Sequence, residues 1–334
     1  MSKHRVLNLR VGDLVEVRSK EEILATLDER GTLDALPFMP EMLIFCGKIF
    51  RVFKHAHKVD DRIEKTGLRR LDHCVILEEV RCSGAWHGSC QAGCNILWKE
   101  AWLRRVRHGV KVEPLSTERR PSASATSDSM AHEGACADET LKKVARRGQG
   151  QAGSFEGRFM CQATELRRAT SSLSRWNLRQ YVLDIWLGNV TFFEFVRGMS
   201  IWLFNEVQAL RGGCWYPSVE QGKLTKTPQI DLNLQPGEMV RVKTKKEIQQ
   251  TLDTGAKNRG LWFDVEMVRY CGGTFRVLRR VHQIIDEKSG KMLHFRTVSI
   301  VLDGVTCRGD YKQFCPQNEL IFWREIWLER VQPG

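Results

Sequence analysis

The 334-residue sequence has no long uninterrupted run of apolar residues. Its longest apolar region, residues 190–210, is broken by Glu194, Arg197 and Glu206, whereas a membrane-spanning helix needs about 20 consecutive apolar residues. Charged residues rather than an apolar stretch follow Met1, and a secretory signal requires that stretch. We therefore expect no transmembrane segment, no secretory signal and a cytoplasmic location.

The short motifs of several common enzyme classes are also missing from the sequence. It has no Gly-rich phosphate loop, no G-x-S-x-G, no H-E-x-x-H and no H-x-E paired with P-C-x-x-C. A nucleophilic cysteine needs an activating base, and His87 with Cys82 or Cys90 is a candidate pair. Metal ligation explains the same residues with fewer assumptions, so the sequence leaves open whether the protein is an enzyme.

The chain is rich in cysteine, with 11 residues, and in positive charge, with 52 Lys and Arg against 40 Asp and Glu. Disulfide frameworks belong to oxidising compartments, so a cytoplasmic chain is expected to carry free or metal-bound thiols. A net charge of +12 favours acidic partners such as nucleic acid, anionic lipid or an acidic protein surface. The alternative interpretation is that the basic residues only solvate the surface.

Residues 81–94 form a loop that concentrates potential metal ligands. Cys82, His87, Cys90 and Cys94 follow the spacing C-x4-H-x2-C-x3-C, and small residues, five of them glycine or alanine, lie between them. Glycine lets a short loop fold back so that side chains converge, and a tetrahedral structural zinc site needs four such ligands. The pattern predicts zinc bound by these four residues. An iron–sulfur cluster and a cysteine-bearing surface loop without metal are the alternatives.

The sequence contains an internal duplication. Residues 8–107 match residues 233–332 at a constant offset of 225, without a gap. We call these two stretches module 1 and module 2. Their matched pairs include Gly12 and Gly237, Val15 and Val240, Thr26 and Thr251, Glu41 and Glu266, Cys46 and Cys271, and Trp98 and Trp323. The two modules are therefore predicted to share one fold.

The duplication also shows which ligands of the metal loop the fold requires, because only some of them recur in module 2. Lys312 takes the position of His87, and Glu319 that of Cys94, so the fold does not require all four ligands. Three cysteines do recur: Cys46, Cys82 and Cys90 match Cys271, Cys307 and Cys315. Cys46 is thus an alternative metal ligand. In module 2 the three cysteines are predicted to be packing residues, since an unbound cysteine behaves as a small buried hydrophobe.

Each module begins with an alternating strand and a short helix. Residues 12–19 read Gly-Asp-Leu-Val-Glu-Val-Arg-Ser, and Ser19 with Glu22 forms a capping box that Thr244 and Glu247 repeat. Further short strands are predicted along each module. This opening and the strand pattern resemble SH3-like barrels of the KOW and Tudor kind, and the resemblance implies two small β-barrel modules.

The region between the modules changes character twice. Residues 108–155 are dominated by small and charged residues, which predicts a disordered linker. Residues 156–232 are predicted to form a helical hairpin and a connecting segment, with helices beginning near Asn177 and Thr191. Apolar residues lie on more than one side of the second helix, so we expect it to be buried. Docking on a membrane or another protein is the alternative.

Two histidines precede the metal loop. His55 and His57 share the parity of a predicted strand and neighbour Lys54 and Lys58. We expect a solvated strand face here, with binding of an acidic ligand as the alternative.

Taken together, these patterns predict an α+β, mainly β chain with two duplicated SH3-like modules that flank the linker and the helical hairpin. The function that they favour is that of a non-enzymatic binding or scaffold protein. A structural zinc loop would brace it, and its partner would be an acidic nucleic acid or protein. The alternative is a metal-dependent enzyme, or an accessory subunit of a biosynthetic enzyme, that uses the Cys/His loop.

Overall fold

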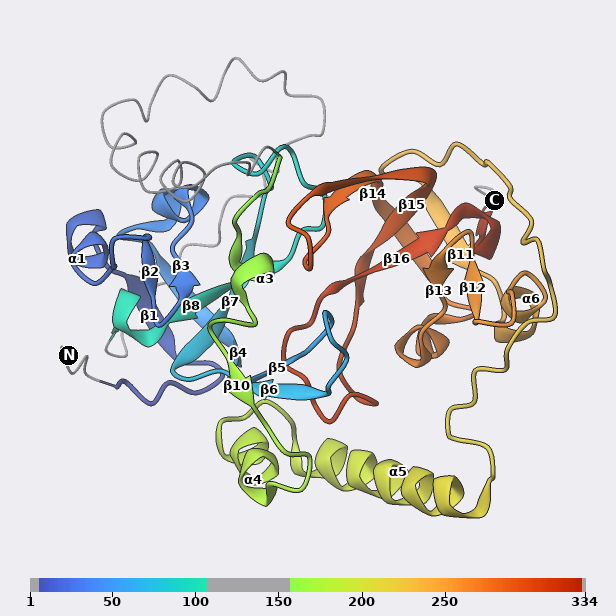
Figure 1. Cartoon of the computed structure of the whole chain (residues 1–334), viewed down its shortest axis with the longest axis horizontal. Helices are drawn as coiled ribbons and strands as arrows, with labels where there is room; N and C mark the ends of the chain where they lie inside the picture. Colours follow the sequence, from blue (N-terminus) through green and yellow to red (C-terminus); the bar gives the residue numbers. More distant parts are fainter. Residues whose placement is uncertain (1–5, 107–156, 332–334) are drawn as a thin grey trace. The chain divides into compact units, whose positions relative to one another are not determined.

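The computed structural model describes residues 6–106 and 157–331 (Figure 1). The chain is mainly β, with two antiparallel β regions separated by residues 107–156 and by helices. The predicted linker, residues 108–155, lies outside the described residues. Within the described residues, no helix is both long and apolar enough to cross a bilayer.

Module 1 is a barrel-like arrangement around a five-stranded antiparallel sheet with the order β8-β7-β4-β1-β9. A second antiparallel sheet has the order β10-β6-β5, in which β10, Ser171–Ser172, comes from the intermodule region, and β2 pairs with β3. The elements of this module are β1 Leu14–Val17, α1 Lys20–Leu24, β2 Thr32–Leu33, β3 Leu36–Pro37, η1 Pro40–Phe45, β4 Ile49–His55, β5 Lys58–Asp60, β6 Leu68–Arg70, β7 Cys74–Arg81, β8 Asn95–Lys99, η2 Glu100–Trp102 and β9 Leu103–Arg105.

Module 2 has the same architecture, as the duplication predicted. Its sheet order, β16-β15-β14-β11-β17, repeats that of module 1 strand for strand, and Val15 opposite Phe50 recurs as Val240 opposite Phe275. The elements are β11 Met239–Val242, α6 Lys245–Gln249, β12 Lys257–Asn258, β13 Leu261–Trp262, η4 Val265–Tyr270, β14 Thr274–Ile285, β15 Met292–Thr306, β16 Leu320–Arg324, η5 Glu325–Trp327 and β17 Leu328–Arg330.

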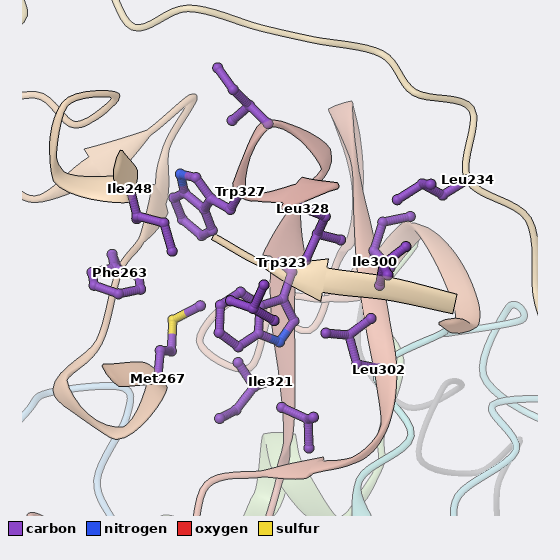
Figure 2. Packing of buried hydrophobic residues seen from close by; sticks show 14 of the residues in the cluster. Leu234, Ile248, Phe263, Met267, Ile300, Leu302, Ile321, Trp323, Trp327 and Leu328 are labelled. Atoms are coloured by element: carbon purple, nitrogen blue, oxygen red, sulfur yellow. The ribbon is translucent and has the colours of Figure 1, made fainter. Parts of the chain in front are cut away.

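The core of each module contains two tryptophans near its end, one in a strand and one in the short helix that follows. Figure 2 shows Trp323 and Trp327 surrounded by apolar side chains of module 2, among them Phe263, Met267 and Ile300. The Phe263 and Trp327 rings meet edge to face at 5.6 Å, and the indole N–H of Trp327 donates to Thr251 Oγ1 at 2.9 Å. Such a bond removes the cost of burying the polar end of the ring. Module 1 repeats this bond between Trp102 and Thr26 at 3.1 Å.

Both predicted capping boxes are present. Ser19 accepts from the Glu22 amide at the start of α1, and Thr244 accepts from the Glu247 amide at the start of α6. In each case the glutamate side chain returns to the backbone of the cap, so two free N–H groups are satisfied. Each helix spans only five residues.

Helices of the intermodule region begin where the sequence predicts. The elements are α3 Gln162–Glu165, β10 Ser171–Ser172, α4 Leu178–Trp186 and α5 Phe192–Arg211. Asn177 caps α4, and Thr191 with Glu194 forms a capping box at α5. The predicted burial of the second helix was wrong, since α5 has no buried residue and Phe193 is 84% exposed. Helical periodicity shows which residues share a face, but it does not show whether another element covers that face.

The described chain divides into two compact units. Of the described residues, unit 1 contains 6–90, 94–106, 157–189 and 285–292, and unit 2 contains 91–93, 190–284 and 293–331. The helix α4 therefore belongs to unit 1, and α5 belongs to unit 2.

Candidate metal centre

Three potential ligands from distant parts of module 1 meet beneath the cysteine loop. His87 Nε2 lies 2.9 Å from Glu41 Oε1 and 3.3 Å from Cys82 Sγ, and the thiol lies 3.2 Å from the same carboxylate oxygen. His87 is 3% exposed and Glu41 is 5% exposed. All three ligand atoms lie within 4.8 Å of one another, so the group could hold one metal ion.

The local fold explains how the loop brings Cys82 and His87 together. Strand β7 ends at Arg81, and the loop then turns back through Gly84, whose φ is +74°. A Cβ at Gly84 would lie 1.9 Å from the Cys90 carbonyl oxygen, so only glycine fits this close approach. The His87 amide donates to the Gly84 carbonyl at 3.0 Å. The loop thus points the His87 ring back toward the end of β7.

Glu41 approaches from a different element. It lies in η1, which begins at Pro40, and η1 carries the carboxylate to the base of the loop. Its Oε2 atom is buried and has no hydrogen-bond partner among the described residues. Burying a carboxylate oxygen without a hydrogen-bond partner costs free energy. This oxygen is therefore available to ligate a metal ion.

Burial, followed by the Glu41 carboxylate, raises the pKa of the Cys82 thiol. The cysteine is therefore protonated at neutral pH in the absence of metal. Binding of a cation requires that proton to leave, because cysteine ligates as a thiolate.

The other predicted ligands lie differently. Cys90 is buried, and its sulfur accepts a hydrogen bond from the Ile285 amide at 3.3 Å. Cys94 is half-buried, and its carbonyl accepts from the Cys82 amide at 2.9 Å. Among the described residues, the group that brings ligand atoms together contains Cys82 and His87 but neither Cys90, Cys94 nor Cys46. Ligation by Cys90 and Cys94 stays a prediction.

Two neighbours of the site were not predicted from the sequence. Glu41 could have been noticed, because it recurs as Glu266 within the duplication. Cys161, at the cap of α3, lies near enough to Cys82 to contribute to the raised pKa of that thiol. The Gln162 side chain holds this segment against module 1 by bonding both the amide and the carbonyl of Leu97 at 2.8 Å.

Module 2 has a lysine where module 1 has a histidine. Burial and the Glu266 carboxylate raise the pKa of Cys307 to about 12, so the carboxyl–thiol pair of module 1 recurs. Lys312 replaces His87, and its ammonium pairs with Asp264 at 2.9 Å. Asp264 itself stands where module 1 has Met39. Among the described residues, module 2 contributes no group of potential metal ligands.

The donor set of module 1 fits zinc. Thiolate sulfur, imidazole nitrogen and carboxylate oxygen are all zinc ligands in proteins. Three protein ligands with an open fourth position are typical of catalytic zinc, whereas four protein ligands are typical of structural zinc. The number of protein ligands therefore decides whether the site is catalytic or structural.

The expectation of a solvated face at His55 and His57 was wrong, because both histidines are only 8% exposed. They belong to a second group of buried polar side chains. His57 Nε2 lies 3.3 Å from Asp184 of α4, whose other oxygen accepts from the Lys58 ammonium at 2.6 Å. His55 Nε2 lies 3.6 Å from Glu100. The acidic groups that face these histidines thus come from the chain itself, Asp184 from α4 and Glu100 from η2.

In the buried group around Asp184, the Asp184 and Lys58 side chains are charged and His57 is neutral. Burial raises the pKa of Asp184 to about 6, while the Lys58 ammonium opposes this shift. Burial, followed by Lys58, lowers the pKa of His57 to about 3. At pH 7 the group consists of an ionised Lys58–Asp184 pair beside a neutral imidazole, which ties α4 to β5.

Comparison with known proteins adds no relative, since no family model, no curated protein and no solved structure matches this chain.

Proposed function

We propose that this protein is a non-enzymatic binding or scaffold protein, built from two SH3-like modules of which the first carries a structural zinc site. The observation that supports the proposal best is the convergence of Glu41, Cys82 and His87 beneath an otherwise irregular loop. A zinc ion bound there would fix the loop to η1 and leave the barrel-like core unchanged. Cys90 or Cys94, the remaining ligands of the predicted set, would complete a closed site.

The positive charge supports an acidic partner, either nucleic acid or protein. A net charge of +12 attracts such surfaces and speeds association with them. Two modules in one chain would engage two sites on one partner and gain avidity. We place the protein in the cytoplasm, where a reducing environment keeps its thiols available for metal.

One observation favours a second candidate function, that of a metal-dependent enzyme or its accessory subunit. Among the described residues, three potential ligands come together rather than four, and an open position would admit water or substrate. X-ray absorption spectroscopy of the metal-loaded protein separates the two functions. Four protein ligands support the structural role, and three with a water support the catalytic one.

The experiment that tests the metal proposal measures metal content per chain. We expect one zinc in the native protein and none in Cys82→Ser or His87→Ala, since each removes a converging ligand. Cys307→Ser, at the matched position of module 2, is the control and should keep the zinc. Equal loss from Cys82→Ser and Cys307→Ser, or no zinc in the native protein, would refute the proposal.

The partner class is tested separately by its response to salt. If nucleic acid is the partner, affinity must fall steeply as salt rises, because binding releases condensed counterions. Absence of binding to RNA and DNA at low salt would leave an acidic protein as the partner.

A further inference from the structure

Module 2 buries a positive charge that its own carboxylates do not neutralise. Arg324, at the end of β16, is 6% exposed. Its guanidinium donates to the carbonyls of Asn258 at 3.2 Å and Arg259 at 2.8 Å, to Ser299 Oγ at 3.1 Å, and to the carbonyls of Thr297 and Val298. No carboxylate among the described residues pairs with it. Burial lowers the pKa of Arg324 to about 10.

Module 1 shows what the same position looks like when the charge is neutralised. Lys99 is the counterpart of Arg324, and its ammonium donates to the Asp72 carbonyl at 3.1 Å, as Arg324 donates to the matched Thr297 carbonyl. The Lys99 ammonium also pairs with the exposed carboxylate of Asp34 at 2.9 Å. The counterpart of Asp34 in module 2 is Arg259. Module 2 thus has a second cation, Arg259, at the position where module 1 has the carboxylate of Asp34.

A pocket of about 90 Å³ lies beside Arg324. Arg296, Asn258 and Thr297 contribute to its lining. The volume suits a group of a few atoms, since a water molecule occupies about 30 Å³ in the liquid. The pocket therefore has room for a small group beside Arg324.

Two carboxylates also line this pocket, but each has partners of its own. Glu325 accepts from the amides of Leu232 and Leu234 and from Arg280 at 2.8 Å. Asp231 accepts from the Asn233 amide at 3.0 Å. Arg280, which lies outside the lining, pairs with Glu325. Arg296 and Arg324 of the lining are thus set against one remaining carboxylate, that of Asp231.

We propose that this pocket binds a carboxylate group, which takes in module 2 the place that Asp34 fills in module 1. Among the described residues, Arg324 Nη2 donates only to the Arg259 carbonyl, so its second N–H is available to a carboxylate, and a hydrogen bond between two charged groups is stronger than one between neutral groups. The inference deepens the proposed function, since it gives an acidic partner a specific contact, and it does not depend on the metal centre.

The test follows the Arg324 Nε–H signal by NMR while sodium acetate is added, with sodium chloride at equal ionic strength as the reference. We expect a saturable shift with acetate only. Arg259→Asp restores the arrangement of module 1 and should weaken acetate binding at least tenfold, because the new carboxylate occupies the site. Residues 34 and 259 both have positive φ, 50° and 46°, so the backbone accepts the exchange.

Arg259→Asn is the matched control, because it removes the same positive charge without adding a carboxylate, and it should keep acetate binding within about threefold. If a tetraglutamate peptide binds more tightly than acetate, the carboxylate ligand belongs to an acidic chain. If the two bind with equal affinity, the ligand is a small molecule. Absence of a saturable shift, or equal binding by the Asp and Asn variants, would overturn the inference. Zinc content, measured alongside, shows independently whether the metal proposal stands.

Discussion

Glu266 shows how strongly one residue's chemistry depends on its surroundings in this protein. Burial raises the pKa of Glu266 to about 6 from its ordinary value of 4.5. The Tyr311 amide donates to Oε1 at 2.7 Å, while Oε2 has no partner among the described residues. The charged form is therefore less stable in the folded state than in the unfolded chain.

The raised pKa predicts a pH dependence of stability. Between pH 4.5 and 6 the folded state binds the Glu266 proton and the unfolded state does not, so the free energy of unfolding falls as pH rises through this window. A shift from 4.5 to about 6 corresponds to about 2 kcal/mol in total. Native-state hydrogen exchange of module 2, compared at each pH with Glu266→Gln, measures it.

Glu266→Gln should lack this pH-dependent part of the free energy of unfolding, because glutamine does not titrate. The comparison at each pH removes the intrinsic effect of pH on exchange, because that effect is the same in both proteins. A difference between the native protein and Glu266→Gln that stays constant from pH 4 to pH 7 would contradict the prediction.

At the scale of elements, the contact between α4 and the strands of module 1 depends on a buried ion pair. Lys58 of β5 and Asp184 of α4 are both fully buried, with 2.6 Å between Nζ and Oδ2. Asn189 adds bonds from its side chain to the amide and the carbonyl of His55 at 2.8 and 2.9 Å. A buried pair of this kind gives specificity to the docking rather than a large net stability.

Asp184→Ala is expected to destabilise the docking of α4 by about 3–5 kcal/mol, because Lys58 would remain buried without its partner. Hydrogen exchange of the α4 amides measures the change. Replacing both residues, Lys58→Met with Asp184→Leu, should recover most of the loss, since no charge stays buried. The surface variant Glu22→Gln, which loses partially exposed pairs with Arg18 and Arg104, should cost less than about 1 kcal/mol.

If Asp184→Ala and Glu22→Gln have equal effects, the buried pair does not hold α4. Failure of the double variant to recover stability would point to the loss of packing instead.

The helix α5 shows a different relation between sequence and structure at this scale. Phe195 stacks on Phe314 at 5.7 Å, and a Cβ at Gly198 would lie 2.4 Å from the same ring. Its remaining large apolar residues include Phe193 and Leu210, which is 89% exposed. Thus α5 contacts module 2 along one narrow line.

At the scale of the whole molecule, the duplication lets one module act as a control for the other. Glu41, Cys82 and His87 of module 1 correspond to Glu266, Cys307 and Lys312 of module 2. Only the third position differs, and in module 2 an ammonium paired with Asp264 supplies the positive charge that a metal would supply in module 1.

Lys312→His combined with Asp264→Met copies the module 1 residues into module 2. We expect metal content to rise from one to two per chain, because histidine joins a carboxylate and a thiol that are already present. Elemental analysis measures the stoichiometry. Lys312→Gln with the same Asp264→Met change offers no such nitrogen ligand and should stay at one. A stoichiometry of one in both variants would show that the three positions do not suffice for a site.

The sequence by itself determined the duplicated fold and part of the site. The gapless offset shows that the two modules share one fold. The capping boxes at Ser19 and Thr244 and the return of the loop at Gly84 depend on residues near one another in the chain. Local steric and hydrogen-bonding rules act over such distances. They also bring Cys82 and His87 together, because a glycine between them allows the loop to close.

Only the tertiary structure decided which distant residues join these elements. Glu41 reaches Cys82 because η1 packs beneath the loop, and buried His57 and His55 face Asp184 of α4 and Glu100 of η2. Likewise, α5 remains exposed although its pattern suggested burial. Periodicity along a chain records which residues share a face, whereas contacts between residues far apart depend on how complete elements pack together, and no local pattern encodes that packing.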